Sequence, residues 1–313
     1  MWDCCVLLLR RRTTTPGWVG CVPMGTTAAL ACVERREGKR PLVRWIEQVP
    51  WTDATASLRA LKKRHGLQRH RCVAVLPRTH YQVLPMDAPD VPRDEWAQAI
   101  RWKLKDSVDF AVDQAAVQLL ELPAGASHRA QPQVLAVAAP LPPLADLVRV
   151  AAAADTPWSA IDIAETALRN ICAVVAAPGQ VLALLHVGHE HSTLVIAAHG
   201  ELLMSRQITF DLAQLSAADA TQSAAAFDRA GLELQRTFDG FERQFGNLSL
   251  ARLLIAPAHA SEAFAAHLRE LLYVPVAPLD LSAALSLRDA PELADPQVLS
   301  DCLGAIGAAL RDD

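Results

Sequence analysis

The sequence predicts a mixed α/β protein in which short strands alternate with amphipathic helices. The chain has 313 residues, enough for two domains or for one large split α/β domain. Apolar residues make up 51% of it, so it can bury a sizeable core. Residues 181–208 have the pattern of three consecutive strands, and residues 232–245 have the pattern of a helix.

The first predicted unit, residues 17–88, is rich in strands. Its opening predicts two strands joined by a glycine-containing turn at residues 24–27, and a third strand in residues 40–51. The elements predicted next are a short amphipathic helix over residues 55–66 and strands over residues 71–76 and 79–85.

A different unit begins near residue 89, where two prolines and three acidic residues mark a helix start. Trp96, Ile100, Leu104 and Val108 then recur every four residues, which predicts one apolar helix face with Trp102 on the other side. Trp102 is therefore either buried on a second side or offered to a partner. The composition of residues 123–133 predicts a loop.

Glu165, within residues 161–175, is compatible with an ordinary charge at a helix N-terminus. A carboxylate there is favoured by the helix dipole. Three strands follow within residues 181–208, and His199-Gly200 predicts a two-residue turn of the primed type.

The last part of the chain predicts three helices and two strands. A long helix within residues 211–246 is expected to bury Leu232, Leu234 and three phenylalanines. A strand over residues 251–257, a helix over 259–272, a short strand over 274–276 and a terminal helix follow. The terminal helix carries glycines and alanines that allow close packing: Gly304, Ala305, Gly307 and Ala308.

Charge and cysteine usage narrow the classes of protein. The formal charge of −4 argues against a general nucleic-acid binder. Residues 1–110 hold 19 Lys and Arg against 11 Asp and Glu, a charge of +8, and the remaining residues sum to −12. This asymmetry suggests a face suited to anionic lipid or an acidic partner, or solvated faces that simply differ. The seven cysteines form no C-x-x-C pair and indicate a reducing compartment.

The N-terminal residues 1–16 contain an apolar run, residues 4–9, followed by three arginines. The run is far shorter than the ~18 residues that span a bilayer. The order of apolar and basic residues is the reverse of a secretory signal. We therefore expect a cytoplasmic protein whose tail either frays or docks weakly on an anionic membrane.

Two stretches resemble one known family. The hairpin over residues 181–208, with Gly188 and Thr193 in its first turn, is similar to the second phosphate-loop hairpin of actin-like ATPases. The run Ala-Ile-Arg-Trp at residues 99–102 resembles the helix that opens an extra subdomain in PilM-like type IV pilus assembly proteins and the related MshI proteins of mannose-sensitive haemagglutinin (MSHA) pili. The likeness extends in order over residues 17–311. In the extra subdomain it implies strands over residues 115–122 and 134–138 and a helix over 142–154. After the subdomain it implies a strand-to-helix step over residues 161–175 that Glu165 opens.

The resemblance implies an α/β actin-like (ribonuclease H-like) fold of two lobes with an extra small subdomain. It divides the chain into an N-terminal tail, a first lobe, an inserted subdomain and a second lobe with returning helices. The corresponding residues are 1–16, 17–88, 89–155 and 156–313.

The same resemblance assigns a degenerate nucleotide site. The family's first phosphate loop contains an aspartate that is absent from residues 20–27 here, and its second opens with an acidic residue where this chain has His186. Nucleotide-binding members also have Gly-Gly where this chain has Ala256-Pro257. Glu233 and Arg236 fall near the expected nucleoside, although an i,i+3 ion pair is the competing interpretation. The site residues implied are Gly25, Thr26, Thr27, Gly188, Ser192, Thr193, Glu233 and Arg236.

The resemblance also implies a partner. PilM-like proteins hold the cytoplasmic tail of a single-span, PilN-like inner-membrane protein between the first lobe and the small subdomain. An extended peptide can add to a sheet edge, and Trp and Arg commonly dominate such sites. Localisation at the cytoplasmic face of the inner membrane and homodimerisation are compatible with this likeness. The partner-binding residues implied are Arg78, Tyr81, Trp96, Arg101, Trp102 and Lys105.

The sequence leaves three functions of different class open. The first is a non-hydrolysing pilus scaffold without a cofactor, the second is an active ATPase using Mg-ATP, and the third is a sugar- or metal-handling enzyme on the same fold. A phosphotransfer site without carboxylates cannot easily hold Mg²⁺, which favours the scaffold. His186, His189 and His191 form the only metal-like cluster in the sequence, but convergence on one ion needs a tight bend, so no metal site is assigned.

Overall fold

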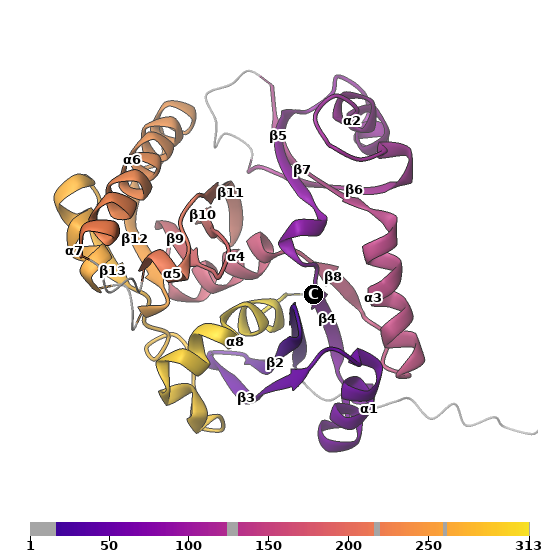
Figure 1. The fold of residues 1–313 in the computed structure, drawn as a ribbon. Helices are drawn as coiled ribbons and strands as arrows, with labels where there is room; N and C mark the ends of the chain where they lie inside the picture. The colour runs from indigo at the N-terminus through magenta and orange to yellow at the C-terminus, as the bar shows by residue number, and fades with distance from the viewer. Residues whose placement is uncertain (1–16, 124–130, 216–219, 259–261, 313) are drawn as a thin grey trace, which may run out of the picture.

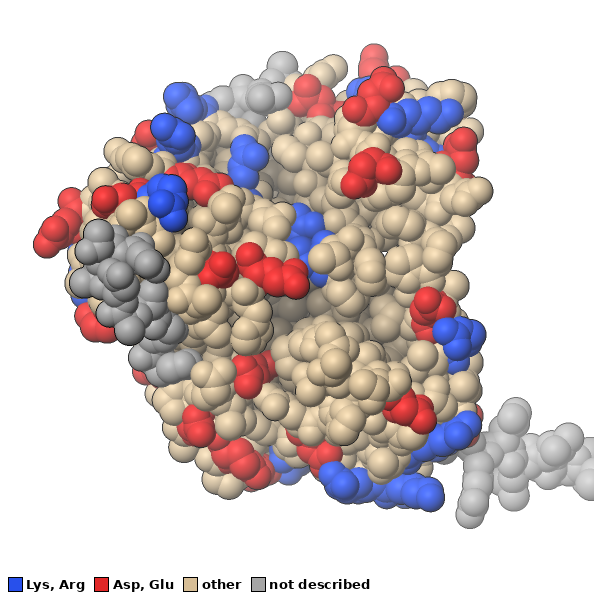
Figure 2. Space-filling view, in the orientation of Figure 1, with Lys and Arg blue, Asp and Glu red and all other residues tan. Residues whose placement is uncertain are grey.

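The computed structural model describes residues 17–123, 131–215, 220–258 and 262–312, and in this part of the chain it contains three β-sheets (Figure 1). Two sheets have five strands each, and the third has three. In the same orientation, Figure 2 shows charged side chains mainly along the rim of this face, with a smaller group near its centre. The predicted tail at residues 1–16 and most of the loop predicted over 123–133 lie outside the described residues.

The first sheet has the strand order β3-β2-β1-β4-β8. Strands β1 to β3 are antiparallel neighbours. Strand β4 runs parallel to β1, and β8 runs parallel to β4. Helix α1, Ala54–His65, begins at Asp53, whose carboxylate accepts the Ala56 N–H, and buries Leu58 and Leu61. The strands are β1 Trp18–Met24, β2 Thr27–Arg36, β3 Lys39–Pro50, β4 Arg71–Val75 and β8 Ala160–Asp162.

The second sheet has the order β11-β10-β9-β12-β13. Its β10–β11 turn places His199 and Gly200 at φ +54° and +79°, the left-handed pair that a primed turn needs, as predicted. One face packs on phenylalanine-rich α6 and on α7. The elements are β9 Val181–Val187, β10 Ser192–Ala198, β11 Glu201–Ile208, α5 Leu212–Leu215, α6 Ala220–Gln244, β12 Leu250–Ala256, α7 Glu262–Leu271 and β13 Val276–Pro278.

The small sheet has the order β5-β7-β6, so β5 and β6 are its edge strands. One face packs against α2 through Trp96, Ile100 and Leu104, which confirms the predicted apolar side of this helix. On the other face, Leu135 belongs to the same buried cluster as Leu182 of β9, so one core extends from the small sheet to the second sheet. The elements are β5 Gln82–Asp87, α2 Trp96–Leu104, β6 Ala115–Glu121, β7 Gln133–Pro140 and α3 Leu141–Ala153.

Helices α4, Ala164–Val175, and α8, Pro296–Ala309, lie between the two five-stranded sheets. Their close approach depends on glycine, as the small residues of α8 predicted. A Cβ on Gly20 of β1 would lie 2.2 Å from the Ala305 carbonyl oxygen. A Cβ on Gly307 would lie 2.3 Å from the carbonyl oxygen of Ala167 in α4. The C-terminal helix is therefore locked against both β1 and α4.

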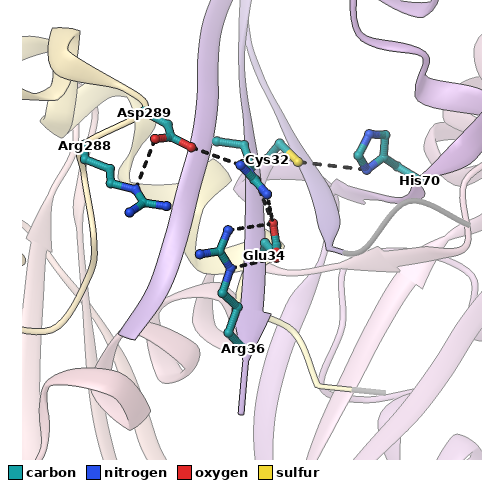
Figure 3. A network of polar contacts seen from close by, with 7 residues as sticks. Cys32, Glu34, Arg36, His70, Arg288 and Asp289 are labelled. Carbon is teal, nitrogen blue, oxygen red and sulfur yellow. Dashed lines mark hydrogen bonds and ion pairs between the residues drawn. The ribbon is translucent and has the colours of Figure 1, made fainter. Parts of the chain in front are cut away.

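The segment before α8 is tied to the edge of the first sheet. Ser286 exchanges backbone hydrogen bonds with Val43 and Pro41, at 3.0 and 2.8 Å. Figure 3 shows the polar network beside it, in which the Glu34 carboxylate of β2 accepts a hydrogen bond from Arg36. The same carboxylate accepts a hydrogen bond from Arg44. Arg44 also bonds Asp289 at 3.1 Å. The edge strand β3 is thus covered at residues 41–43, near its start.

Short 3-10 helices connect several elements. They are η1 Leu67–Arg69, η2 Arg78–His80, η3 Arg93–Glu95, η4 Val112–Gln114 and η6 Pro291–Ala294. The strand predicted over residues 79–85 begins later, at Gln82, because Arg78 donates to the Tyr81 carbonyl at 2.8 Å and closes a turn there.

The prediction that Leu232 lies in the core is wrong, since this side chain is 47% exposed. Leu234, Phe238, Phe241 and Phe245 are fully buried as expected. Residues two apart on an α-helix point to nearly opposite sides, so Leu232 and Leu234 cannot both face the same sheet.

Candidate functional site

The first predicted phosphate turn joins β1 to β2. Gly25 has φ +67°, and both Gly25 and Thr26 are exposed at the tip. The Thr27 hydroxyl lies 3.4 Å from the Met24 carbonyl oxygen, and the Thr26 carbonyl accepts the Trp51 N–H at 2.7 Å. These contacts account for a tight hairpin turn without any ligand.

The second predicted phosphate turn, between β9 and β10, is filled by the chain itself. A Cβ on Gly188 would lie 2.8 Å from the His191 carbonyl oxygen, which accepts the Gly188 N–H at 3.1 Å. The Gly188 carbonyl in turn accepts the Leu212 N–H at 2.8 Å. A backbone carbonyl of the same turn therefore already requires glycine at this position, and the expectation that it admits a ligand stays a prediction.

The two hydroxyls predicted for this loop are buried. Ser192 is fully buried, and its hydroxyl donates to the Phe210 carbonyl at 2.6 Å. Thr193 is 7% exposed and pairs with His186 across the β9–β10 ladder. Burial lowers the pKa of His186 from 6.5 to about 4, so this imidazole is neutral at pH 7. An uncharged imidazole thus replaces the carboxylate of the family pattern.

Glu233 and Arg236 lie on α6, away from both turns in sequence. The Glu233 carboxylate accepts the backbone N–H of Thr209 at 3.3 Å. Glu233 therefore holds the segment that follows β11, whereas the i,i+3 ion pair with Arg236 is not among the contacts of the described residues.

A pocket of about 420 Å³ lies where the three sheets meet. The first sheet contributes the segment after β4. The small sheet contributes the start of β5, the segment after α2 and the end of β7. The second sheet contributes the β9–β10 turn and β11. Neighbouring polar side chains are already paired in part, since Gln82 donates to Asp109 at 2.8 Å. The lining residues are Arg78, Thr79, His80, Tyr81, Gln82, Asp109, Phe110, Pro140, Glu190, His191 and Gln207.

A buried polar cluster forms the floor of this region. Tyr81, 2% exposed, donates its hydroxyl to Glu165 at 2.6 Å and accepts the Ala164 N–H at 3.1 Å. Arg78 Nε lies 3.3 Å from Glu165 Oε1 as an ion pair without hydrogen-bond geometry, and the guanidinium covers the Tyr81 ring with its carbon 4.7 Å from the ring centroid. The cluster joins the first sheet to the start of α4.

Burial dominates the electrostatics of this cluster. It raises the pKa of Glu165, and the Arg78 charge and the Tyr81 hydroxyl offset part of that rise. Burial and the neighbouring carboxylate raise the pKa of Tyr81 well above its usual range, so the phenol keeps its proton and acts as a donor. Glu165 is therefore more than a charge at a helix start, because Arg78 and Tyr81, both distant in the sequence, contact its carboxylate.

Among residues 17–312, apart from the short undescribed segments, no group of three or more His, Cys, Asp or Glu side chains is placed to hold a metal ion. No helix in the described ranges is long and apolar enough to cross a membrane.

Comparison with known proteins places this architecture. No protein-family model matches the sequence, and no curated protein matches it. A solved structure described as the PilM-PilN type IV pilus biogenesis complex is similar over 94% of this chain and 98% of that chain, with a TM-score of 0.72 and 17% identity. The chain has the actin-like fold.

A second similar structure supports this assignment. It is a Bacteroides thetaiotaomicron protein described as having an actin-like ATPase fold and unknown function. The likeness covers 92% of this chain and 97% of that chain, with a TM-score of 0.50 and 10% identity. At these identities the comparison establishes the actin-like fold, as the sequence predicted, and no activity.

Only some of the predicted partner-binding residues line the pocket. Arg78 and Tyr81 line the pocket. Trp96 is 9% exposed and donates its indole N–H to the Val91 carbonyl at 3.0 Å, so it is mainly a core residue of α2. Arg101 donates to the carbonyls of Val112 and Ala115 at 2.9 and 2.8 Å.

Trp102 and Lys105 form an exposed pair on α2. Trp102 is 67% exposed, and the Lys105 ammonium lies 4.1 Å from the centroid of its ring. The alternative that Trp102 is a core residue is therefore wrong. An exposed Trp covered by a cation is available to a partner, although neither side chain lines the pocket.

Sequence reasoning missed much of the pocket lining. Gln82, Asp109, Phe110 and Gln207 come from three separate segments, and none carries a motif. Their shared signal is position, because Gln82 and Gln207 lie at the ends of strands whose order was not known from the sequence.

Proposed function

We propose that this protein is a non-hydrolysing actin-like scaffold of a type IV or MSHA-like pilus system. It would bind the cytoplasmic tail of a PilN-like inner-membrane protein and work at the cytoplasmic face of that membrane. The observation that carries the proposal is the polar pocket at the junction of three sheets, beside the free edge of β5. The likeness over 94% of the chain to a structure described as a PilM-PilN complex supports it.

The edge strand β5 suits the capture of an extended peptide. It pairs only with β7, so its other edge has no strand partner within the three-stranded sheet. Gln82, the first residue of β5, lines the pocket together with Gln207 of β11. A tail that added to β5 would gain main-chain hydrogen bonds, and the pocket would select its side chains.

The proposal that the protein does not hydrolyse nucleotide rests on the two turns. Neither the residues of the first turn nor His186 supplies a carboxylate for Mg²⁺. Ser192 already donates its hydroxyl to Phe210, and the His191 carbonyl occupies the space that Gly188 leaves. A phosphate would have to displace both contacts.

A peptide titration tests the scaffold directly. A fluorescent peptide of ~15 residues from the start of the candidate membrane partner, long enough for strand addition, is titrated with the full chain. Replacing Gln82 and Gln207 by Ala together should weaken binding about thirtyfold, since each net hydrogen bond contributes about 1 kcal/mol. Trp102→Ala should weaken binding at least about tenfold if this residue is a main contact.

Gln118→Ala provides the matched control, because Gln118 is exposed on β6 at the opposite edge of the same sheet. Binding that Gln118→Ala weakens as much as the pocket double variant would refute the pocket. A wild-type chain that binds no pilus membrane-protein tail would refute the scaffold.

The ATPase alternative has its own assay. Mg-ATP should leave the melting temperature unchanged, whereas tight binding at 100-fold excess over Kd would stabilise the fold by about 2.7 kcal/mol. Hydrolysis that is lost in Thr193→Ala would establish the ATPase instead.

A further inference from the structure

A strongly basic surface lies far from the pocket, around α1. Residues 54–71 contain six Lys and Arg and no Asp or Glu. In Figure 2, Lys and Arg side chains gather along the lower edge, in the region where Figure 1 shows α1. The end of α1, helix η1 and the end of α3 together enclose a concavity of about 660 Å³. We call the surface formed by Arg59, Lys62, Lys63, Arg64, Arg69 and Arg71 the α1 basic surface.

Part of this charge has a structural explanation. Lys62 pairs with Asp155 at 2.5 Å, and Arg64 and His65 both contact the Glu47 carboxylate at 2.6 Å. Cations in the last turn of a helix also complement its dipole. These contacts tie α1 to β3 and to the end of α3.

The remaining charge is not explained in this way. Arg59 donates to the Ala153 carbonyl at 2.8 Å, whereas Lys63 and Arg69 are exposed. Within the described part of the chain, none of these three side chains has an acidic partner. Uncompensated cations grouped on one face create a positive potential that an anionic partner would lower.

The cations are held on a rigid support. Leu58 and Leu61 bury one side of α1 in the core of the first sheet, and the Gly66 N–H closes the helix on the Lys62 carbonyl at 2.9 Å. His65 stacks on Trp45 with a centroid distance of 4.0 Å. A rigid basic face loses little entropy when it meets an extended charged surface.

One cation of the α1 basic surface packs on β1. Trp18 of β1 is in register with Arg71 of β4, and the Arg71 guanidinium carbon lies 5.6 Å from the centroid of the Trp18 ring. This cation–π contact holds Arg71 at the edge of the surface.

We infer that the α1 basic surface docks on a bilayer that contains anionic phospholipids. A planar membrane contacts one face only, so the net negative charge of the remaining chain stays in solvent. Nucleic acid is a less suitable partner, because no Phe, Tyr or Trp side chain lines the concavity for base stacking. The inference goes beyond tail binding, since it orients the scaffold through a separate surface.

Vesicle co-sedimentation of the full chain tests the inference. Vesicles of phosphatidylglycerol and phosphatidylcholine should bind the wild type, and phosphatidylcholine alone should not. Each cation removed should weaken binding about fivefold, so Lys63→Gln with Arg69→Gln should weaken it about 25-fold. High salt should abolish binding. Because neither side chain has an acidic partner in the described residues, the variant should keep its melting temperature.

The matched control is Arg229→Gln with Arg243→Gln, which removes the same charge from exposed positions of α6. Its binding should equal that of the wild type. Equal losses in the two variants, equal binding to vesicles without the anionic lipid, or tighter binding of a short DNA duplex would each overturn the inference. Because the vesicles contain no protein, failure here would leave the tail-binding proposal standing.

Discussion

Replacing Tyr81 by Phe removes one buried hydroxyl and tests how the first sheet is joined to α4. That hydroxyl donates to Glu165 at 2.6 Å and accepts the Ala164 N–H at 3.1 Å. A hydrogen bond to a charged group contributes about 1.5–3 kcal/mol, and a buried unpaired N–H adds to the loss. We expect Tyr81→Phe to lower the free energy of unfolding by about 2–4 kcal/mol at pH 7.

The chain has only one other tyrosine, which provides the matched control. Tyr273 is 53% exposed, and its hydroxyl contacts Glu242. Tyr273→Phe should therefore change the free energy of unfolding by less than about 1 kcal/mol. Urea unfolding followed by circular dichroism measures both variants against the wild type.

The pH dependence separates this cluster from a simple packing defect. The folded-state pKa of Glu165 is raised above its usual value, so the folded chain holds this proton more tightly than the unfolded chain does. Removing the Tyr81 hydroxyl raises that pKa further. The loss of unfolding free energy in Tyr81→Phe should therefore be largest at pH values above the raised pKa of Glu165. It should become smaller as the pH falls through that pKa. A deficit equal to that of Tyr273→Phe, or one that grows on acidification, would refute the reasoning.

Two further predictions concern the packing of α8 and the titration of His186. Gly20→Ala should lower the free energy of unfolding in urea by about 2–3 kcal/mol, because the added Cβ would lie 2.2 Å from the Ala305 carbonyl oxygen. The control Gly240→Ala adds a Cβ that has nothing within 4 Å, so it should raise the free energy of unfolding by about 0.5–1 kcal/mol. A Gly20→Ala protein as stable as the wild type would contradict the packing. Burial lowers the His186 pKa from 6.5 to about 4, so the unfolded chain binds this proton more readily than the folded chain. The free energy of unfolding should therefore decrease by up to about 3 kcal/mol as the pH is lowered from 6.5 to 4. His186→Gln should lack that fall, and equal pH profiles for variant and wild type would exclude His186 as its source.

Local chemistry determined most of the elements. The β-branched and apolar runs at residues 181–208 form strands, and His199-Gly200 adopts the left-handed turn that joins two of them. The four-residue spacing from Trp96 to Leu104 set the buried side of α2. These features depend on neighbours within a few residues, which any one sequence displays directly.

The use of individual polar groups was decided by tertiary structure. Ser192 looks like a phosphate ligand in the sequence, but its hydroxyl meets a carbonyl that the fold brings back from residue 210. The sequence did not decide whether Trp102 is buried or exposed, and the packing of α2 leaves it exposed. Glu165 meets Arg78 and Tyr81 only because β4 and β8 pair and deliver both segments to one point. Such contacts join residues distant in the chain, and no local propensity specifies them, because their free energy arises only when separate elements pack and exclude water.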